Sequence, residues 1–421
     1  DTTRRDAVAP WAPSGRTPRL AELASQSTVF DHAWAVAPWT LPAHASIFTG
    51  LYPSHHGAGV WSDGLPDDRV TLAERLREAG YTAVGLAGGR LASFRLGLGQ
   101  GFAAYRDPAG GEVTADVLTD AALAALEVVG DEPLFLFVNY FDPHTKYRAP
   151  AEFRARTGVD DRRRALAGLP IWELFGEGWS PGVWTAILDG RAGQPPEGLA
   201  YLRALYDAEV EFMDHHLGRL VDELRRRGRW DDALVVVVGD HGEALGERGR
   251  FTHSTWLDPP ILEVPLLIKW PGQGTPARVA SPVTQVDLFG TILAALGLAA
   301  DAGDGLRFGP DDLRALTGRP PLLAEEHAAR LHQLPAGRKI ADHLFALQWS
   351  GRREVFWSGG LECEAGAPGA WLQVTCQGSW PERLAALPGA MQAAAGLAAD
   401  FDVGDIDPEE AEHLRALGYL E

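Results

Sequence analysis

The sequence predicts an α/β protein with a large, mostly parallel sheet flanked by helices and a smaller C-terminal antiparallel sheet. Helical and strand patterns alternate, first at 70–79 and 81–87 and again downstream, as expected where helices connect parallel strands. Two continuous apolar runs, 134–140 and 233–238, are typical of parallel strands that are buried on both faces. From about residue 320 the pattern changes to short strand candidates separated by turns, which indicates a small antiparallel sheet.

Length and composition set the domain organisation. The chain has 421 residues, of which 46% are hydrophobic, enough for one large domain and a smaller one. We predict a catalytic α/β domain over 1–318, with an insertion at about 150–198, and a smaller α+β subdomain over 319–421. The tryptophans of the insertion either wall a site above the strand ends or only pack the insertion itself.

The charge of the chain restricts its partners. A formal net charge of −19 makes it a poor binder of nucleic acid and of anionic membranes. An anionic small molecule remains possible as a substrate, because a bound cation can reverse the local field. No apolar run reaches the length of a membrane span. Cys363 and Cys376 are the only cysteines and could pair, while cellular location and oligomeric state stay unknown at this point.

The segment 38–50 places one hydroxyl, that of Thr40, at an expected helix start. Pro42 suits the first turn of a helix, where a missing N–H costs nothing, and Gly50 suits its end. The N-terminus of a helix carries free N–H groups and a positive dipole, so it is a ready site for phosphate or sulfate. The alternative interpretation is a plain helix cap.

Polar side chains follow both apolar runs. Asp240 and His241 come directly after 233–238, and a carboxylate and an imidazole at one strand end can converge on one divalent cation. His144 and Lys146 follow the run 134–140; the first could give a proton to a leaving group and the second could bind an oxyanion. Because the carboxyl ends of parallel strands share one edge of a sheet, we expect these side chains to converge.

Together these motifs resemble the sulfatase family, within the larger alkaline phosphatase superfamily. The family signature reads Cys or Ser, any residue, Pro, Ser, Arg, then an apolar pair and Thr-Gly. At the same spacing this chain reads Thr40-Leu41-Pro42-Ala43-His44, then Ile47-Phe48 and Thr49-Gly50. The resemblance implies an alkaline phosphatase-like fold and a metal-dependent hydrolase of sulfate- or phosphate-type esters.

Three departures from the family pattern refine this expectation. Thr40 stands where sulfatases have the Cys or Ser that is oxidised to formylglycine, and threonine cannot give that aldehyde. Asp240-His241 stands where sulfatases usually have Asp-Asn or Asp-Gln. Both departures resemble the phosphodiesterase and phosphonate monoester hydrolase branches of the superfamily, which implies a preference for phosphorus esters. His44 stands in place of an Arg, so the substrate-binding role that it inherits rests on a single donor.

The resemblance also implies the metal centre. Asp1 looks like the first metal-binding carboxylate of the family, which gives a ligand set of Asp1, Thr40, Asp240 and His241 for one divalent metal ion. Mixed oxygen and nitrogen donors favour manganese or zinc over calcium. Because the family places an apolar strand immediately before this Asp, we expect a first strand upstream of Asp1.

Two further residues are assigned to the substrate by resemblance. His253 stands where relatives have a His or Lys that touches the substrate. Arg90 stands where they have the Lys of a Gly-Lys motif. For each of them a solvated surface loop is the alternative interpretation.

The resulting hypothesis is nucleophilic catalysis. Thr40 attacks phosphorus or sulfur in line and forms a covalent intermediate, His144 with Lys146 or His253 assists the leaving group, and water releases Thr40. One alternative is a phosphotransferase, in which an alcohol takes the group from the same intermediate. The other is a non-catalytic binding protein on a degenerate sulfatase fold.

Overall fold

A computed structural model describes residues 1–310 apart from 13, 60–63, 109–110, 160–195, 248–250, 254–256, 273–275 and 300–302, then 313–316 and the strands between 322 and 374. Most of the predicted insertion and Cys376 lie outside these residues. The boundary between the two predicted domains, at 318, therefore stays a prediction.

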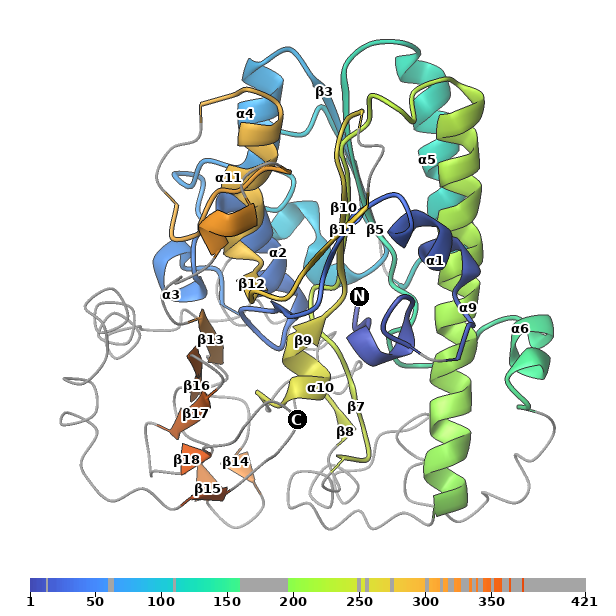
Figure 1. The fold of residues 1–421 in the computed structure, drawn as a ribbon, viewed down its shortest axis with the longest axis vertical. Helices are drawn as coiled ribbons and strands as arrows, with labels where there is room; N and C mark the ends of the chain where they lie inside the picture. Colours follow the sequence, from blue (N-terminus) through green and yellow to red (C-terminus); the bar gives the residue numbers. More distant parts are fainter. Residues whose placement is uncertain are drawn as a thin grey trace.

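Helices cover both faces of a central layer of strands (Figure 1). One face carries α2 (Thr40–Thr49), α4 (Leu72–Glu78) and α11 (Val286–Ala295). The opposite face carries α1 (Pro18–Ala24), α5 (Ala115–Val129) and α9 (Pro196–Arg226). Shorter helices are α3 (Pro53–His56), α6 (Ala151–Arg156) and α10 (Pro259–Leu262). The predicted α/β architecture is thereby confirmed.

The central layer consists of two groups of strands. In the first group β3 (Thr82–Ala87) lies between β4 (Ala104–Arg106) and β5 (Leu134–Asn139), and all three are parallel. The second group has the order β11 (Ala277–Val279), β1 (Thr28–Phe30), β10 (Leu266–Lys269) and β6 (Val235–Val238). Here β11 and β1 are parallel, whereas β10 runs antiparallel to both of its neighbours. The layer is mostly parallel, as the sequence predicts.

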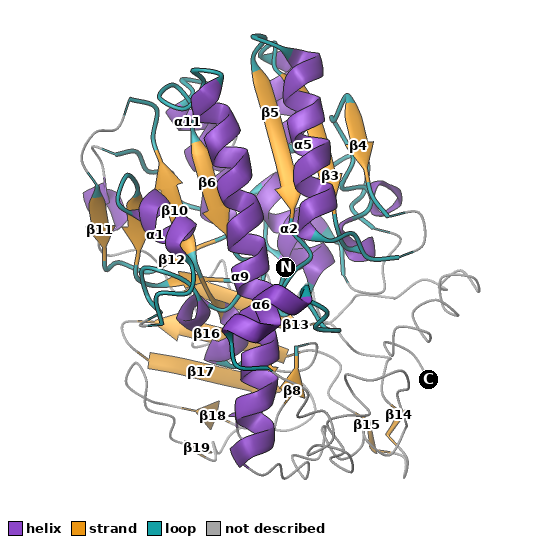
Figure 2. Ribbon diagram, turned by 90° about the vertical axis from the view of Figure 1, so that its right-hand side faces the viewer, coloured by secondary structure: helices purple, strands orange, loops and turns teal. Residues whose placement is uncertain are grey.

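The two groups face each other across an apolar cavity. Among the described residues β5 pairs only with β3, and β6 pairs only with β10. A cavity of about 710 Å³ lies between them, lined by residues 134–140, by 234–239 and by apolar side chains from helices on both faces. The two strands run in the same direction (Figure 2), and Asp1 also lines this cavity. The N–H and C=O groups on the facing edges of β5 and β6 therefore form no hydrogen bonds to a neighbouring strand among the described residues.

Small sheets of two or three strands surround the carboxyl end of the layer. Between β12 (Val283–Thr284) and β9 (Glu263–Val264) lies β2 (Ala33–Trp34), and β7 (Ala244–Leu245) pairs with β8 (Phe251–Thr252). Towards the C-terminus β13 (Leu322–Glu326), β16 (Leu344–Trp349) and β17 (Arg352–Trp357) form an antiparallel sheet. Two-stranded pairs are formed by β14 (Gln333–Leu334) with β15 (Arg338–Lys339) and by β18 (Cys363–Glu364) with β19 (Gln373–Val374). The predicted C-terminal antiparallel sheet is confirmed.

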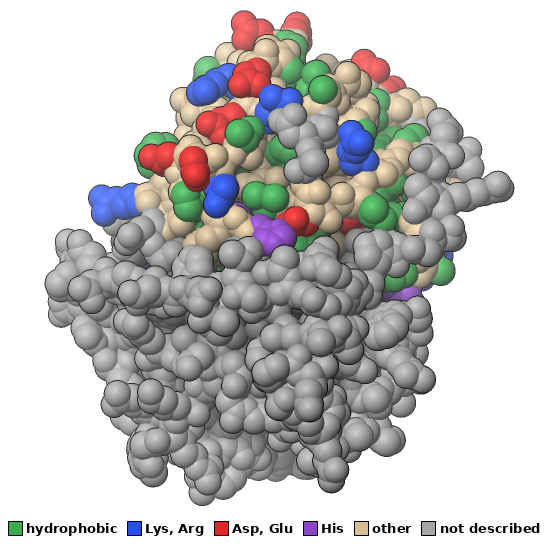
Figure 3. All heavy atoms as spheres, turned by 90° about the vertical axis from the view of Figure 1, so that its left-hand side faces the viewer, with side chains coloured by type: hydrophobic (Ala, Val, Ile, Leu, Met, Phe, Trp, Pro, Cys, Tyr) green, Lys and Arg blue, Asp and Glu red, His purple; other side chains and the backbone are tan. Residues whose placement is uncertain are grey.

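The described surface is mixed in charge. On the face drawn in Figure 3, the basic and acidic side chains of the described residues are interspersed. The expectation that nucleic acid is not a partner stays a prediction. Among the described residues every helix is too short or too polar to cross a bilayer.

Candidate metal centre and active site

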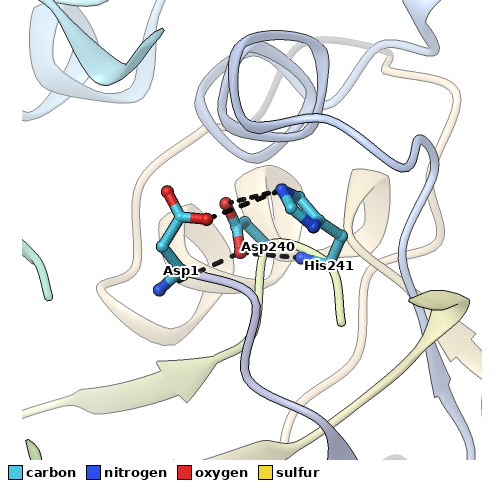
Figure 4. A group of neighbouring side chains, drawn as sticks. All are labelled: Asp1, Asp240 and His241. Carbon is cyan, nitrogen blue, oxygen red and sulfur yellow. Dashed lines mark hydrogen bonds and ion pairs between the residues drawn. The ribbon is translucent and has the colours of Figure 1, made fainter. Parts of the chain in front are cut away.

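Three polar side chains converge at the carboxyl end of β6 (Figure 4). This strand ends at Val238, and Gly239 leads directly into Asp240 and His241. The Nε2 atom of His241 lies 3.5 Å from Oδ2 of Asp240 and 3.6 Å from Oδ1 of Asp1. Each residue offers one donor atom, and the three atoms lie within 4.8 Å of one another.

This arrangement fits a divalent metal ion. Asp1 Oδ1 and Asp240 Oδ2 are buried and accept no hydrogen bond from the described residues, a costly situation for a carboxylate unless an ion compensates it. Burial lowers the pKa of His241 to about 3, so its imidazole is neutral, the form that binds metals.

Thr40 lies beside the group formed by Asp1, Asp240 and His241. It is the first residue of α2, after Trp39 in an extended conformation, and Gly50 ends the helix at φ 71°. The Thr40 hydroxyl donates to Asp1 Oδ2 at 3.2 Å and lies 3.5 Å from Nε2 of His241. The structure thus brings all four predicted metal ligands together.

The backbone around the metal ligands is braced by residues that sequence reasoning missed. Asp240 Oδ1 accepts the N–H groups of Thr2 and of His241, at 3.0 and 2.7 Å. Gln285 donates to the carbonyls of Gly239 and Asp240, at 2.9 and 2.6 Å, and accepts Val36 N–H. Gln285 was not among the predicted site residues, because a side-chain bridge across 45 residues leaves no local signal in the sequence.

The first residues of the chain are held in the same way. The Tyr206 hydroxyl, on α9, donates to the Thr2 carbonyl and accepts the Arg4 N–H, both at 2.8 Å. Thr2 has φ 47°, a left-handed conformation that costs a non-glycine residue free energy and is common near active sites. These two bonds are the support that Tyr206 gives to the first residues of the chain.

His44 lies one helical turn after Thr40 and both its ring nitrogens are engaged. Its Nδ1 lies 2.7 Å from the Thr40 carbonyl, so it must donate there, and Nε2 lies 3.4 Å from Nδ2 of Asn139, which donates to it. Burial lowers the pKa of His44 despite the nearby charge of Asp240, in agreement with a neutral ring. This ring has no N–H left for an oxyanion, so the substrate-binding role of His44 stays a prediction without support from its contacts.

The predicted proton donors form a second cluster beside the metal ligands. The ring centroid of His253 lies 4.5 Å from that of His241 and 5.1 Å from that of His144. Burial is the main reason why the pKa of His144 falls to about 3 and that of His253 to about 4. Nδ1 of His253 lies 3.2 Å from Oε1 of Glu243, a buried carboxyl to which the sequence assigned no role. Burial raises the pKa of Glu243 to about 8.

The two predicted cationic residues lie at the edge of this region. Arg90 is half-buried and follows Gly88-Gly89, whose Gly89 lies against Phe141 and Asp1. Lys146 is half-buried, and together with Arg148 its charge opposes the burial that raises the pKa of Glu112. Their contacts with substrate stay predictions.

The comparison with protein families agrees with this geometry. The family model described as Sulfatase matches residues 3–298, which include all of the site except Asp1 and Thr2. This chain belongs to the sulfatase family. The match covers the sheet, the helices on both faces and the β7–β8 hairpin, so the resemblance stated from the motifs is confirmed.

Individual relatives of this sulfatase-family chain are distant. It is 23% identical over 318 residues to the uncharacterized sulfatase YidJ of Escherichia coli (strain K12), covering 66% of this chain and 62% of that protein. It is 34% identical over 277 residues to the low-salt glycan biosynthesis sulfotransferase Agl7 of Haloferax volcanii, covering 65% of this chain and 56% of that protein. The chain thus spans less than two thirds of the length of either relative.

A solved structure supports the fold over almost the full length. The phosphonate monoester hydrolase SpPMH from Silicibacter pomeroyi superimposes with a TM-score of 0.70 at 21% identity, covering 96% of this chain and 94% of that one. At this identity the likeness shows the shared alkaline phosphatase-like fold. The function has to be argued from the site itself.

Proposed function

We propose that this chain is a metal-dependent hydrolase of sulfate- or phosphate-type esters that uses Thr40 as its nucleophile. Its substrate is a small anionic ester, and we favour phosphodiesters or phosphonate monoesters. The preference for phosphorus rests on Thr40 and His241, which both depart from the sulfatase pattern. Membership of the sulfatase family supports ester hydrolysis in general.

One observation carries this proposal. The only hydroxyl at the start of α2 points at Asp1 and His241, at 3.2 and 3.5 Å, and is almost fully buried. A plain helix-capping Thr would instead accept an N–H of its own first turn. Among the described residues Thr40 makes no such bond. Its hydroxyl contacts Asp1 and His241 and does not cap the helix.

The residues around Thr40 suit an attack on phosphorus or sulfur. Its hydroxyl proton passes to the carboxylate of Asp1 as the bond from Oγ to the central atom forms and the bond to the leaving oxygen breaks. The first intrahelical bond of α2 runs from Ala43 N–H to Trp39, so the Thr40 and Leu41 N–H groups lie at the positive end of the helix. They are placed to stabilise the charge that develops on the non-bridging oxygens.

His144, with Lys146 or His253, assists the leaving oxygen, which takes its proton from solvent because burial keeps both imidazole rings neutral. In the second half of the reaction, water attacks the central atom of the covalent intermediate, one water proton goes to solvent, and Thr40 recovers its own proton from Asp1. A divalent ion bound by Asp1, Asp240, His241 and Thr40 would supply positive charge that lowers the pKa of the Thr40 hydroxyl. The donor set favours manganese or zinc over calcium.

The test is a panel of aryl esters: a sulfate, a phosphate monoester, a phosphodiester and a phosphonate monoester. Each is assayed with metal added and with metal removed, on the parent protein and on Thr40→Ala. We expect the diester or the phosphonate to turn over fastest, and Thr40→Ala to lower kcat by about 10³-fold or more. The matched control is Thr157→Ala, at the end of α6, where the hydroxyl only donates to Arg154 O.

Each outcome has a definite meaning. Sulfate as the best substrate would refute the phosphorus preference but keep the Thr-nucleophile hydrolase. Full activity in Thr40→Ala would refute the nucleophile. No turnover of any ester with any metal would refute the hydrolase and favour a binding protein.

A transferase is the second candidate, because the Haloferax relative with 34% identity is named a sulfotransferase. The same Thr40 intermediate would then be resolved by an alcohol, which takes the sulfuryl or phosphoryl group in place of water. The assay is repeated with a high concentration of glycerol as acceptor. A glycerol ester as the main product would favour the transferase, whereas unchanged hydrolysis would favour the hydrolase.

A further inference from the structure

The loop after β5 carries two of the predicted site residues. It runs from Asp142 to Ala149 and includes His144 and Lys146. This loop, all of it described, contains turns and bends but neither helix nor strand, so no regular hydrogen-bond pattern fixes its backbone. Its place beside the metal ligands therefore depends on side chains that reach it from other elements.

Glu209, on α9, is bonded to the far end of this loop. Its Oε1 atom accepts the N–H groups of both Arg148 and Ala149, and Glu209 is only 3% exposed. An apolar side chain in its place would leave both N–H groups without their acceptor, which costs about 1–3 kcal/mol for each group that stays buried. The end of the loop is thus held by a single carboxyl.

The same side chain is bonded to the near end of the loop. The carboxyl groups of Glu209 and Asp142 share a hydrogen bond, and Oδ2 of Asp142 accepts the N–H of Ala115, the first residue of α5, at 2.7 Å. Burial, together with the charge of Asp142, raises the pKa of Glu209 to about 9, which retains the proton that a bond between two carboxyls needs. Glu209 therefore joins both ends of the loop.

Small side chains let the loop approach both helices closely. Ala115 on α5, Ala149 in the loop and Ala208 on α9 belong to one buried apolar cluster. Ala208 directly precedes Glu209 in the sequence. Packing thus brings the end of the loop against α5 and α9, and the bonds to Glu209 fix which of its backbone groups faces which helix.

We propose that Glu209 is a positioning residue that holds both ends of the 142–149 loop and thereby presents His144 and Lys146 to the ester. This inference rests on the proposed hydrolysis at Thr40, which assigns the loop to the substrate. The carboxyl of Glu209 is engaged by the two ends of the loop, so it acts through the loop and not on the substrate itself.

The first test follows the loop without any turnover. Glu209→Leu removes the bonds to both ends, whereas Glu209→Gln keeps an acceptor for Arg148 and Ala149 and offers an amide N–H to Asp142. We expect amide hydrogen exchange at Ala149 to be faster by about 10-fold or more in Glu209→Leu and to change by less than about 3-fold in Glu209→Gln. Unchanged exchange in Glu209→Leu would refute the proposal.

The second test measures kcat/KM for the ester that the parent hydrolyses fastest. We expect Glu209→Leu to lower kcat/KM by about 10–100-fold, because a small displacement of His144 and Lys146 is enough for such a loss, and Glu209→Gln to stay within about 3-fold of the parent. The matched control is Glu211→Leu, on the same helix, which removes a carboxyl that is 9% exposed and accepts a bond from Arg16. An equal loss in Glu211→Leu would overturn the proposal.

A combined variant separates positioning from a general loss of structure. If Glu209 acts through the loop, Glu209→Leu adds less than about 3-fold to the loss already caused by His144→Ala with Lys146→Ala. A further loss of 10-fold or more would overturn the proposal. The stabilisation of the protein by added manganese should be the same in Glu209→Leu as in the parent, and its loss would also overturn the proposal, because the metal centre itself would then be disturbed.

The exchange and the rates together keep this proposal distinct from the hydrolase. Faster exchange in Glu209→Leu, in a protein that hydrolyses none of the esters, would support the role of Glu209 in the loop and refute the proposed function. Hydrolysis by the parent, together with unchanged exchange and unchanged kcat/KM in Glu209→Leu, would refute the role of Glu209 alone.

Discussion

The strands β5 and β6 contribute both to the carboxyl end and to the middle of the central layer. At the carboxyl end the site is held by hydrogen bonds from other parts of the chain, whereas in the middle the two strands do not pair with each other. At the end of β6, backbone and side-chain groups around Asp240 are held by Thr2, His241 and Gln285. A few residues back along β5 and β6, the two strands face an apolar cavity of about 710 Å³ without a ladder between them. The position of the metal ligands therefore depends on side-chain contacts as well as on hydrogen bonds between strands. The next three predictions examine the two regions in turn.

The largest effect is expected in the cavity. A chain that carries six added Val and Ile residues directly before Asp1 should be more stable by several kcal/mol than one with six added Gly and Ser residues. Six residues match the length of β5, and each apolar side chain that enters the cavity contributes about 1.5–3 kcal/mol before the cost of ordering. Thermal unfolding measures the difference, and hydrogen exchange should slow at the amides of β5 and β6.

The Gly-Ser extension is the matched control, since it has the same length but little apolar surface. Equal unfolding temperatures for the two extensions would contradict the expectation that the cavity accepts an apolar strand. Slower exchange at β3 and β4 alone would also contradict it, because no residue of these two strands lines the cavity.

A smaller effect is expected at the polar end. Manganese or zinc at 100 times its dissociation constant should stabilise the parent protein by about 2.7 kcal/mol. Asp240→Asn should lose most of this gain, because Asn keeps the acceptor for Thr2 and His241 N–H but removes the charge on Oδ2. Thermal unfolding with and without the ion is the measurement, and Asp68→Asn, which is largely exposed, is the control. A full metal-dependent gain in Asp240→Asn would refute the proposed ligand set.

The smallest effect is expected from a carboxyl pair near the site. Burial, together with the charge of Asp142, raises the pKa of Glu209 to about 9, so Glu209 stays protonated in the folded protein. The unfolded chain releases this proton above about pH 4.3, and stability should therefore fall between about pH 4.3 and 9, by at most about 1.4 kcal/mol per pH unit. Glu209→Gln keeps the bonds from Arg148 and Ala149 N–H and should remove this part of the slope.

Denaturant unfolding at pH 5, 7 and 9 measures that slope. The surface variant Glu127→Gln, at a largely exposed side chain, should keep the slope of the parent. A Glu209→Gln variant as pH-dependent as the parent would show that Glu209 is ionised in the folded protein.

The sequence predicted the parts of the molecule that have a local signal. The apolar runs predicted β5 and β6, and the helical pattern at 70–79 predicted α4. Both kinds of burial leave a pattern in neighbouring residues of the sequence. Asp240 and His241 were found because they follow such a run directly. Asp1 and Thr40 were found through the family motif, and the structure places them at the same strand ends.

What the sequence could not predict depends on pairing across long separations. The antiparallel β10 enters between β1 and β6, although it follows β6 by almost thirty residues. Glu243 meets His253 only through the register of a hairpin. The sequence identified His44 as a candidate but could not show its side-chain conformation. In the structure its two ring nitrogens contact the Thr40 carbonyl and the Asn139 side chain. These contacts are set by packing in three dimensions.

Asp1 links the two strands on either side of the cavity. Its backbone nitrogen donates to the Tyr140 carbonyl at 2.6 Å, directly after β5, and its Oδ1 lies 3.6 Å from Nε2 of His241, which follows β6. A change in the spacing of β5 and β6 should therefore move the Asp1 carboxylate relative to Asp240 and His241. What fills the cavity between these strands should accordingly change the affinity for a divalent cation as well as the free energy of unfolding.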